Sequence, residues 1–267
     1  MLKDVTLGQY FPGDTPIHRL DPRTKLILVV VYIVALFLAK RFVSYGVVLA
    51  FLLLVILLSK ISLRVIAKSI RPLLLIIALT AILNLFYTQG EIIAQFWIFR
   101  ITKEGVVNAV LMMLRITMLV VGTFMLTYTT SPIALTDGLE RLLSPLKRLR
   151  FPVHELSMMM CIALRFIPTL IEETDKIISA QKARGADFES GNVIRRARAL
   201  IPILVPLFIT AFRRADELAT AMECRCYHGG EGRTKMNVLH YRRCDGVAAI
   251  AGAVLLAAVI VLRHFGL

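Results

Sequence analysis

The sequence predicts an all-α polytopic membrane protein with about five transmembrane helices and long amphipathic helices on its cytoplasmic side. Residues of the AVILMFWYC set make up 57% of the 267-residue chain, and the mean hydropathy is +0.73. Soluble globular chains hold about 45–50% apolar residues even when glycine is counted. The chain also carries 32 Lys and Arg against 18 Asp and Glu, for a net charge of +14. A soluble nucleic-acid binder could carry that charge, but it could not bury so much apolar sequence.

Apolar runs mark the expected membrane spans, because about 20 such residues cross a bilayer. The five runs are Leu26–Ala39, Phe42–Leu58, Pro72–Thr88, Gly105–Thr130 and Val247–Leu262. Only Lys40-Arg41 separates the first two, which predicts two helices joined by a tight turn. Several runs are short for a bilayer, so tilt and snorkelling of the flanking Lys and Arg are expected.

Basic side chains between the runs predict the orientation, because cytoplasmic loops carry an excess of Lys and Arg. They gather in residues 1–25, in the loop from Lys60 to Arg71 and in the stretch 131–246, which holds 18 Lys and Arg against 13 Asp and Glu. Residues 1–25 contain three prolines and no apolar core, so they do not predict a signal peptide. We therefore expect a cytoplasmic N-terminal segment (1–25), a membrane domain of about four helices (26–130), a cytoplasmic domain (131–246) and a final membrane helix (247–267).

The stretch 131–246 predicts three amphipathic helices at the cytoplasmic surface. The first covers Ser131–Leu149, where Ser131-Pro132 suits a helix cap and first turn. The second covers Glu155–Arg184, where apolar residues recur at intervals of three and four and so mark one helix face. The third covers Ile194–Arg225 and is expected to be interrupted by Pro202 and Pro206.

The second and third of these helices end in an internal repeat. A single constant shift along the chain superposes identical residues in the two copies: Asp175 on Asp216, Ala180 on Ala221 and Arg184 on Arg225. Each copy ends in a small residue, an arginine and another small residue: Ala183-Arg184-Gly185 and Cys224-Arg225-Cys226. The alternative is a chance similarity between two amphipathic helices.

The arginine of each copy is suited to binding another protein. A cation near a helix C-terminus is favoured by the helix macrodipole. Small neighbours let the helix end enter a groove, where a guanidinium can bind a carboxylate through two hydrogen bonds. The competing interpretation is that Arg184 and Arg225 merely cap their own helices.

Together with the two repeat motifs, the N-terminal segment resembles a sequence signature of a known protein family. It reads Gly8-Gln9-Tyr10-Phe11-Pro12-Gly13-Asp14, followed by Ile17-His18-Arg19-Leu20-Asp21-Pro22-Arg23-Thr24-Lys25. Over essentially its whole length the chain resembles the transmembrane T component (EcfT) of energy-coupling factor (ECF) transporters. The Tyr-Phe-Pro-Gly-Asp opening is more similar to the shared-module type, which serves several S components, than to dedicated cobalt, nickel or biotin importers.

The resemblance implies a role for each part of the cytoplasmic domain. In that family two long coupling helices cross, and each delivers its motif arginine to one of two ABC-type ATPase subunits. It therefore implies that Arg184 and Arg225, with their neighbours Ala183, Gly185, Cys224 and Cys226, contact the ATPases. It further implies a small membrane-embedded S component that captures a vitamin or a metal ion. ATP and Mg²⁺ would be bound by the ATPases, with no cofactor on this chain.

Three other groups of residues are candidate sites. Cys224-x-Cys226-x-His228, with His240 and Cys244, could be drawn as a metal site, but the spacing is unusual and the repeat favours small packing residues. Arg115 falls near the middle of the fourth span, where a charge marks a functional site by default; it is expected either to contact Asn84 or to snorkel outward. Met158-Met159-Met160 could form an adaptable surface or fill a core.

No catalytic motif is present in the sequence: it has no Walker A loop, His-Glu-x-x-His or Gly-x-Ser-x-Gly. A membrane-embedded lipid enzyme would need titratable residues clustered at one depth, and none is evident. A nucleic-acid or polyanion binder is disfavoured because acidic residues are interleaved with the basic ones in 131–246.

Overall fold

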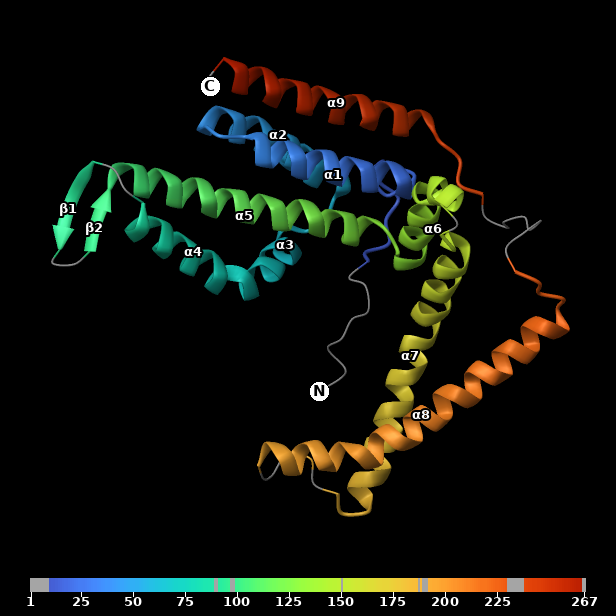
Figure 1. The fold of residues 1–267 in the computed structure, drawn as a ribbon. Helices are drawn as coiled ribbons and strands as arrows, with labels where there is room; N and C mark the ends of the chain where they lie inside the picture. The colour runs from blue at the N-terminus through green and yellow to red at the C-terminus, as the bar shows by residue number, and fades with distance from the viewer. Residues whose placement is uncertain are drawn as a thin grey trace. The chain divides into compact units, whose positions relative to one another are not determined.

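The computed structural model of this chain describes residues 10–88, 91–96, 99–149, 151–186, 188, 192–229 and 238–265. They form a mainly α-helical, polytopic membrane protein (Figure 1). The chain divides into two compact units. We call Gly8–Leu139 with Leu239–Leu267 the membrane unit and Glu140–Val238 the α7–α8 unit, and describe each by itself.

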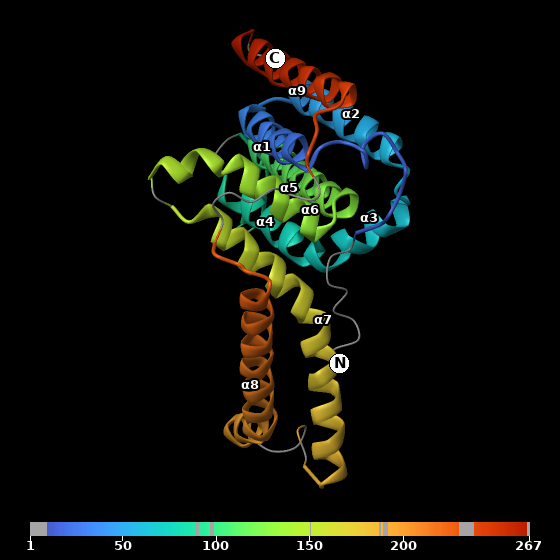
Figure 2. The same ribbon diagram turned by 90° about the vertical axis from the view of Figure 1, so that its right-hand side faces the viewer.

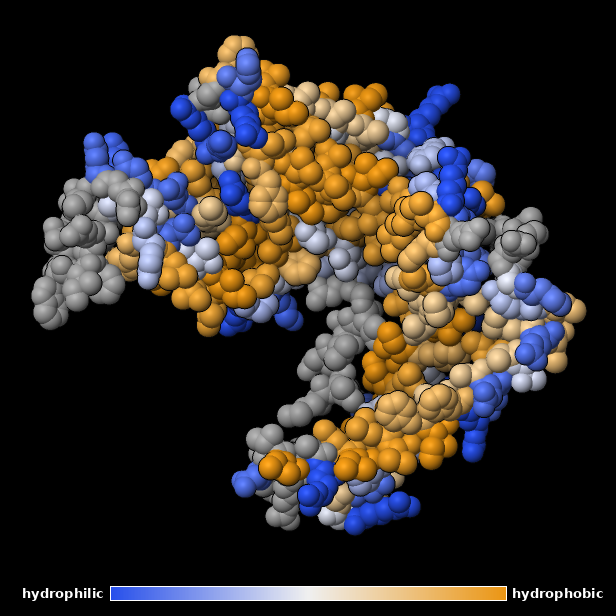
Figure 3. Space-filling model, viewed as in Figure 1, coloured by the Kyte–Doolittle hydropathy of each residue, from blue (hydrophilic) through white to orange (hydrophobic). Residues whose placement is uncertain are grey.

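The helices of the membrane unit follow the predicted apolar runs. They are α1 (Pro22–Leu38), α2 (Phe42–Ser59), α3 (Leu63–Ile70), the 3-10 turn η1 (Arg71–Leu73), α4 (Leu74–Tyr87), α5 (Lys103–Thr129) and α9 (Arg243–His264). The turn predicted at Lys40-Arg41 joins α1 to α2. Their surface is broadly apolar in Figure 3, with exposed side chains such as Leu57, Leu75 and Val254. Such a surface is suited to lipid rather than water.

Five of the described helical segments are long and apolar enough to cross a membrane, which is the predicted number. They are α2, the continuous stretch Leu63–Tyr87, α5, α7 (Val153–Ala183) and α9. The membership differs from the prediction. Helix α1, which at 17 residues is one residue shorter than α2, is not among them, and α7 is. α7 is the least apolar of the five, and its assignment to the cytoplasmic stretch stays a prediction.

A β-hairpin that the sequence analysis did not predict joins α4 to α5. Strands β1 (Ile92–Phe96) and β2 (Phe99–Thr102) pair antiparallel, with Ile92 opposite Thr102. The Thr102 hydroxyl donates to the Thr88 carbonyl at 2.9 Å and accepts from the Gly105 amide at 3.1 Å. This one side chain therefore caps α5 and ties it to the end of α4.

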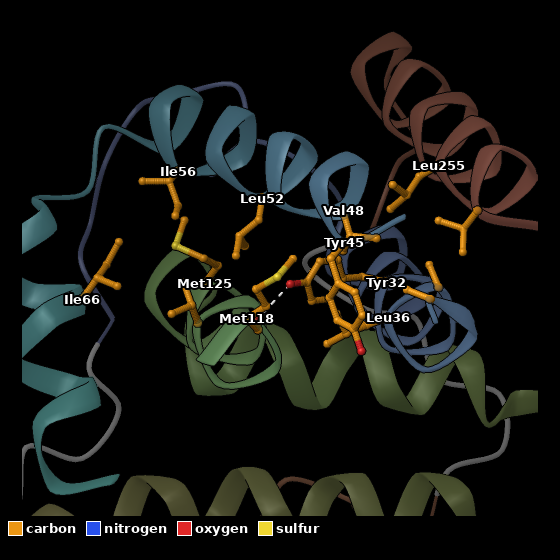
Figure 4. Packing of buried hydrophobic residues seen from close by; sticks show 14 of the residues in the cluster. Tyr32, Leu36, Tyr45, Val48, Leu52, Ile56, Ile66, Met118, Met125 and Leu255 are labelled. Carbon is orange, nitrogen blue, oxygen red and sulfur yellow. Dashed lines mark hydrogen bonds between the residues drawn. The ribbon is translucent and has the colours of Figure 1, made fainter. Parts of the chain in front are cut away.

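The core of the membrane unit lies where α1, α2, α5 and α9 meet (Figure 4). The Tyr32 hydroxyl donates to the Met118 carbonyl at 2.9 Å and joins α1 to α5. Gly122 lies against the Tyr32 ring, where an added Cβ would come within 2.3 Å of Cε1. Gly252 meets Leu28 in the same way at 2.5 Å. Small residues thus let the membrane helices approach closely.

The α7–α8 unit consists mainly of two long helices, α7 and α8 (Val193–Cys224), which pack against each other (Figure 2). The predicted interruption of the second one is wrong, because α8 is continuous through Pro202 and Pro206. Instead, α8 changes direction along its length in Figure 1. Each proline removes a backbone hydrogen bond and so bends the helix without ending it.

The first predicted amphipathic helix is shorter than expected. Helix α6 (Pro132–Leu142) gives way to the 3-10 helix η2 (Ser144–Leu149). The Ser131 hydroxyl accepts a hydrogen bond from the Ala134 amide at 3.3 Å, so the predicted cap at Ser131-Pro132 is confirmed.

Candidate functional site

The C-terminus of α7 is closed by its own backbone. The Gly185 amide donates to the Lys182 carbonyl and the Ala186 amide to the Gln181 carbonyl, each at 3.0 Å. Gly185 has φ +85°, in the left-handed region. This is a Schellman motif with Arg184 at the helix cap and glycine in the position that favours it.

The C-terminus of α8 has the same arrangement at the equivalent position of the repeat. The Cys226 amide donates to the Glu223 carbonyl at 2.8 Å, and the Tyr227 amide donates to the Met222 carbonyl at 3.0 Å. Arg225 is the cap, and Cys226 takes the left-handed position with φ +56°. The two copies of the repeat therefore end in the same backbone structure.

Cys226 takes the left-handed position in the second copy that Gly185 takes in the first. A side chain in the left-handed region costs about 1–2 kcal/mol, a cost that glycine avoids. Small size alone, which the sequence analysis used to explain this cysteine, therefore does not account for it. The second helix end is locally strained where the first is not.

Both motif arginines are exposed to solvent at the ends of their helices. Arg184, Arg225 and the flanking residues Ala183, Gly185, Cys224 and Cys226 are all exposed. Neither guanidinium forms a hydrogen bond or ion pair with the part of the chain that the structure describes. Both arginines occupy the cap position of their helices, but the cap hydrogen bonds come from backbone amides and not from the guanidinium groups.

The two helices contact each other at equivalent positions of the repeat. The Arg214 guanidinium donates to the Glu173 carboxylate across the α7–α8 contact, and these residues are 41 positions apart, as Arg184 and Arg225 are. Gln181 Nε2 also donates to the Pro202 carbonyl at 3.5 Å. Between these two contacts the residue number rises along α7 and falls along α8. The two helices are therefore antiparallel.

The two arginines lie at equal sequence distances from this ion pair. Arg184 lies as far beyond Glu173 in the sequence as Arg225 lies beyond Arg214. At 1.5 Å per residue, each helix end lies about 16 Å along its helix from the ion pair. Since the helices are antiparallel, the two ends lie on opposite sides of the crossing.

The N-terminal signature residues join three helices of the membrane unit. Asp21 caps α1 by accepting from the Arg23 amide at 2.9 Å, and its own amide donates to Asp245 of α9 at 2.8 Å. The buried Lys25 ammonium donates to the Thr129 carbonyl at 2.8 Å, at the end of α5. The signature therefore holds together the ends of α1, α5 and α9.

His18 fixes the loop that precedes α1. Its Nε2 donates to the Phe11 carbonyl at 3.0 Å, and its Nδ1 lies 2.6 Å from the Thr15 hydroxyl. Burial lowers the pKa of His18 below its usual value, and the hydrogen bond to Phe11 offsets part of that shift. Because a carbonyl only accepts, the neutral ring carries its proton on Nε2 and accepts from Thr15.

Arg115 contacts α1 and α2 rather than Asn84, so the expected contact with Asn84 is wrong. Its Nε donates to the Tyr45 hydroxyl at 2.6 Å and its Nη2 to the Ala39 carbonyl at 3.2 Å. The Asn84 amide instead donates to the Thr80 carbonyl of its own helix. Arg115 thus places a cation at the C-terminal end of α1, which the helix macrodipole favours.

The other candidates are the cysteines with the histidines near them, and the three consecutive methionines of α7. Among the residues with described placement, no group of three or more His, Cys, Asp and Glu side chains could hold a metal ion. The four cysteines form no disulfide with one another. Met159 is 58% exposed on α7, which agrees with the adaptable-surface interpretation of Met158-Met159-Met160 better than with core filling.

Comparison with known proteins assigns the family. The family model described as "Cobalt transport protein" (CbiQ) matches residues 13–236. A protein of Thermosediminibacter oceani named energy-coupling factor transporter transmembrane protein EcfT is 54% identical over 98% of this chain and 99% of its own length. Proteins of the same name from Clostridium kluyveri and Bacillus subtilis are 52% and 46% identical, each over 98% of this chain and at least 98% of their own length. The chain therefore belongs to the EcfT family, the transmembrane T components of energy-coupling factor transporters.

Proposed function

We propose that this T component couples two ABC-type ATPase subunits to a small membrane-embedded S component, and so drives import of a vitamin or another micronutrient. The observation that carries the proposal is the pair of matched helix ends. Each presents an exposed arginine with no partner in the described part of the chain, on a helix end closed by its own backbone. Two equivalent ends suit two similar grooves.

Arg184 and Arg225 each bind a carboxylate in a groove of one ATPase. The flanking residues Ala183, Gly185, Cys224 and Cys226 are small, so the helix ends enter the grooves without obstruction. The crossing at Glu173 and Arg214 separates the two ends, which lets each meet a different subunit. ATP and Mg²⁺ are bound and ATP is hydrolysed on those subunits, so this chain needs no cofactor of its own.

The S component rests on apolar side chains of α8. Leu200, Ile201, Leu204, Val205, Phe208, Ile209 and Phe212 are all exposed. A contiguous apolar surface of this kind marks contact with a protein or with lipid. When the ATPases close on ATP, the two coupling helices tilt and this surface moves with them.

The chain lies in the bacterial plasma membrane with its N-terminus in the cytoplasm, as the distribution of Lys and Arg favours. The S component selects the substrate, and the Tyr10-to-Asp14 opening favours a shared module that serves several S components. No nucleic acid takes part.

Co-purification tests the proposal. The tagged full-length chain is isolated from its native membrane, and the proteins that elute with it are identified by mass spectrometry. We expect two different ATPases and more than one small hydrophobic protein. Arg184→Ala should lose one ATPase and Arg225→Ala the other. Lys176→Ala and Arg213→Ala are matched controls, because both remove an exposed cation from the same helices away from the caps.

Retention of both ATPases by the Arg184→Ala, Arg225→Ala double variant would contradict the assignment of these residues. Absence of any ATPase from the wild-type preparation would contradict the proposed function. A single S component would instead indicate a dedicated importer.

A further inference from the structure

The membrane unit contains an apolar cavity of about 440 Å³. It is lined by the loop before α1 and by facing sides of α1, α2, α5 and α9. Its volume lies in the range of small-molecule sites in proteins. A helix of a partner protein is 10–12 Å across, so a single turn of it would already fill roughly this volume. The cavity therefore suits a flexible chain rather than a helix of a partner protein.

The cavity lies at one end of the helix bundle. Its lining includes the C-terminal halves of α2 and α5 and the first turns of α1 and α9. Hydrogen bonds from Lys25 to Thr129 and from Asp21 to Asp245 hold these ends together. A ligand here would have its apolar part between the helices and its polar part at the membrane surface.

The charged side chains that line the cavity are both cationic. Lys25 is buried, and its ammonium lies within hydrogen-bonding distance of three uncharged oxygens, those of the His18 and Thr129 carbonyls and the Thr130 hydroxyl. Arg243 is exposed and has no hydrogen-bond or ion-pair partner in the described part of the chain. No Asp or Glu is among the lining residues. The nearby Asp245 accepts from the backbone amides of Asp21 and Arg242, so Arg243 remains free for a ligand.

We propose that the cavity binds an anionic phospholipid, with an acyl chain between α1, α2, α5 and α9 and the phosphate at Arg243. An apolar body with a cationic mouth complements a lipid whose headgroup carries a net negative charge. A zwitterionic headgroup adds a cation of its own, which Arg243 would repel. A basic residue near the membrane surface gives about a fivefold preference for an anionic headgroup. The site does not depend on ATPase docking, because none of its residues belongs to α7 or α8.

Lipid retention tests this site. The purified full-length chain is reconstituted in vesicles of equal parts phosphatidylcholine and phosphatidylglycerol, extracted in mild detergent and examined by native mass spectrometry. We expect bound phosphatidylglycerol in excess of phosphatidylcholine. Arg243→Gln should reduce that preference about fivefold, and Arg243→Lys should keep it. Arg263→Gln is the matched control, since Arg263 is exposed at the other end of α9.

A second pair of variants tests the cavity itself. Ala251 and Ala257 are both exposed on α9, but only Ala251 lines the cavity. Ala251→Phe should reduce retention of both lipids, whereas Ala257→Phe should not. Equal retention of the two lipids by the wild-type chain, or the same preference in Arg243→Gln as in Arg263→Gln, would overturn the proposal. The Arg243 comparison stands alone if Ala251→Phe fails to fold, because an exposed side chain is changed without altering the core.

Discussion

Glu173 and Arg214 form an ion pair between α7 and α8, and they are separated by the same 41 residues that separate Arg184 from Arg225. The helices therefore contact each other through one pair of equivalent residues of the repeat. Another equivalent pair, Arg184 and Arg225, lies at the helix ends. The spacing from the ion-pair residue to the motif arginine is the same in both copies, so the ion pair and the two helix ends follow the internal repeat. The proposed coupling of two ATPases depends on this geometry.

Reversing the charge of one partner should weaken the crossing, and reversing both should restore it. Glu173→Arg or Arg214→Glu alone places like charges together, and we expect substrate uptake to fall severalfold. The stability effect should be about 1 kcal/mol or less, because both side chains are partly exposed. Thermal unfolding and uptake are measured on the same preparations.

The double reversal, Glu173→Arg with Arg214→Glu, should recover most of the lost uptake. Glu172→Arg is the control, because Glu172 is an exposed neighbour with no partner in the described part of the chain. A double variant as impaired as either single one would mean that the pair does not define the crossing.

The two caps should respond in opposite directions to exchange of their left-handed residues. Cys226→Gly should stabilise the end of α8 by about 1 kcal/mol, and Gly185→Ala should destabilise the end of α7 by a similar amount. Hydrogen exchange of the last-turn amides reports both effects. If Cys226→Gly lowers protection, Cys226 makes a contact that outweighs its backbone strain.

Replacing Cys224 by Ala and Cys226 by Gly together should preserve uptake, since this restores the residues of the first motif. A metal site formed by Cys224, Cys226 and His228 predicts collapse instead. Loss of uptake together with loss of stoichiometric bound metal would establish that metal site.

Arg115 should contribute to folding rather than to transport. Arg115→Gln removes charged hydrogen bonds to Tyr45 and Ala39 and should destabilise the protein by about 1.5–3 kcal/mol. Tyr45→Phe removes only one of them and should cost less. Arg41→Gln, an exposed arginine at the same turn, is the control. A large loss of uptake per folded molecule in Arg115→Gln, with unfolding temperature unchanged, would assign Arg115 a role in transport.

A reversible cross-link at the crossing tests whether the helices move. Glu173→Cys and Arg214→Cys are combined in a background without the native cysteines and joined by a short, cleavable thiol reagent. Uptake should be lost relative to the same protein before cross-linking, while ATPases and S component stay bound, and reduction should restore it. Unchanged uptake by the verified cross-linked protein would make α7 and α8 a static scaffold.

Much of the fold could be predicted because lipid forces apolar segments to satisfy their backbone hydrogen bonds as helices. The runs from Leu26, Phe42, Gly105 and Val247 each correspond to an observed helix with small shifts at the ends. The hairpin of β1 and β2 was missed because its strands are short and lie between two strong helical signals. Helix α7 shows that length and composition alone do not separate a membrane span from a long amphipathic helix.

Only those parts of the candidate site that belong to the internal repeat could be predicted from the sequence. The constant shift between the two copies located both helix ends, and the same shift could have found Glu173 and Arg214, since it superposes opposite charges. It could not reveal that Cys226 adopts a left-handed conformation, because that depends on how the cap closes. The contact of Arg115 was mispredicted because tertiary packing, not depth in the membrane, selects its partner.

Uptake by the Arg184→Ala, Arg225→Ala double variant is the most direct test of the central claim that these two arginines couple the ATPases to transport. Loss of one partner of a buried charge pair at an interface costs roughly 2–5 kcal/mol. At wild-type expression, each single variant should therefore lose at least about tenfold in uptake, and the double variant should fall to background while its membrane helices remain folded. Normal uptake by the double variant at wild-type expression would contradict the account.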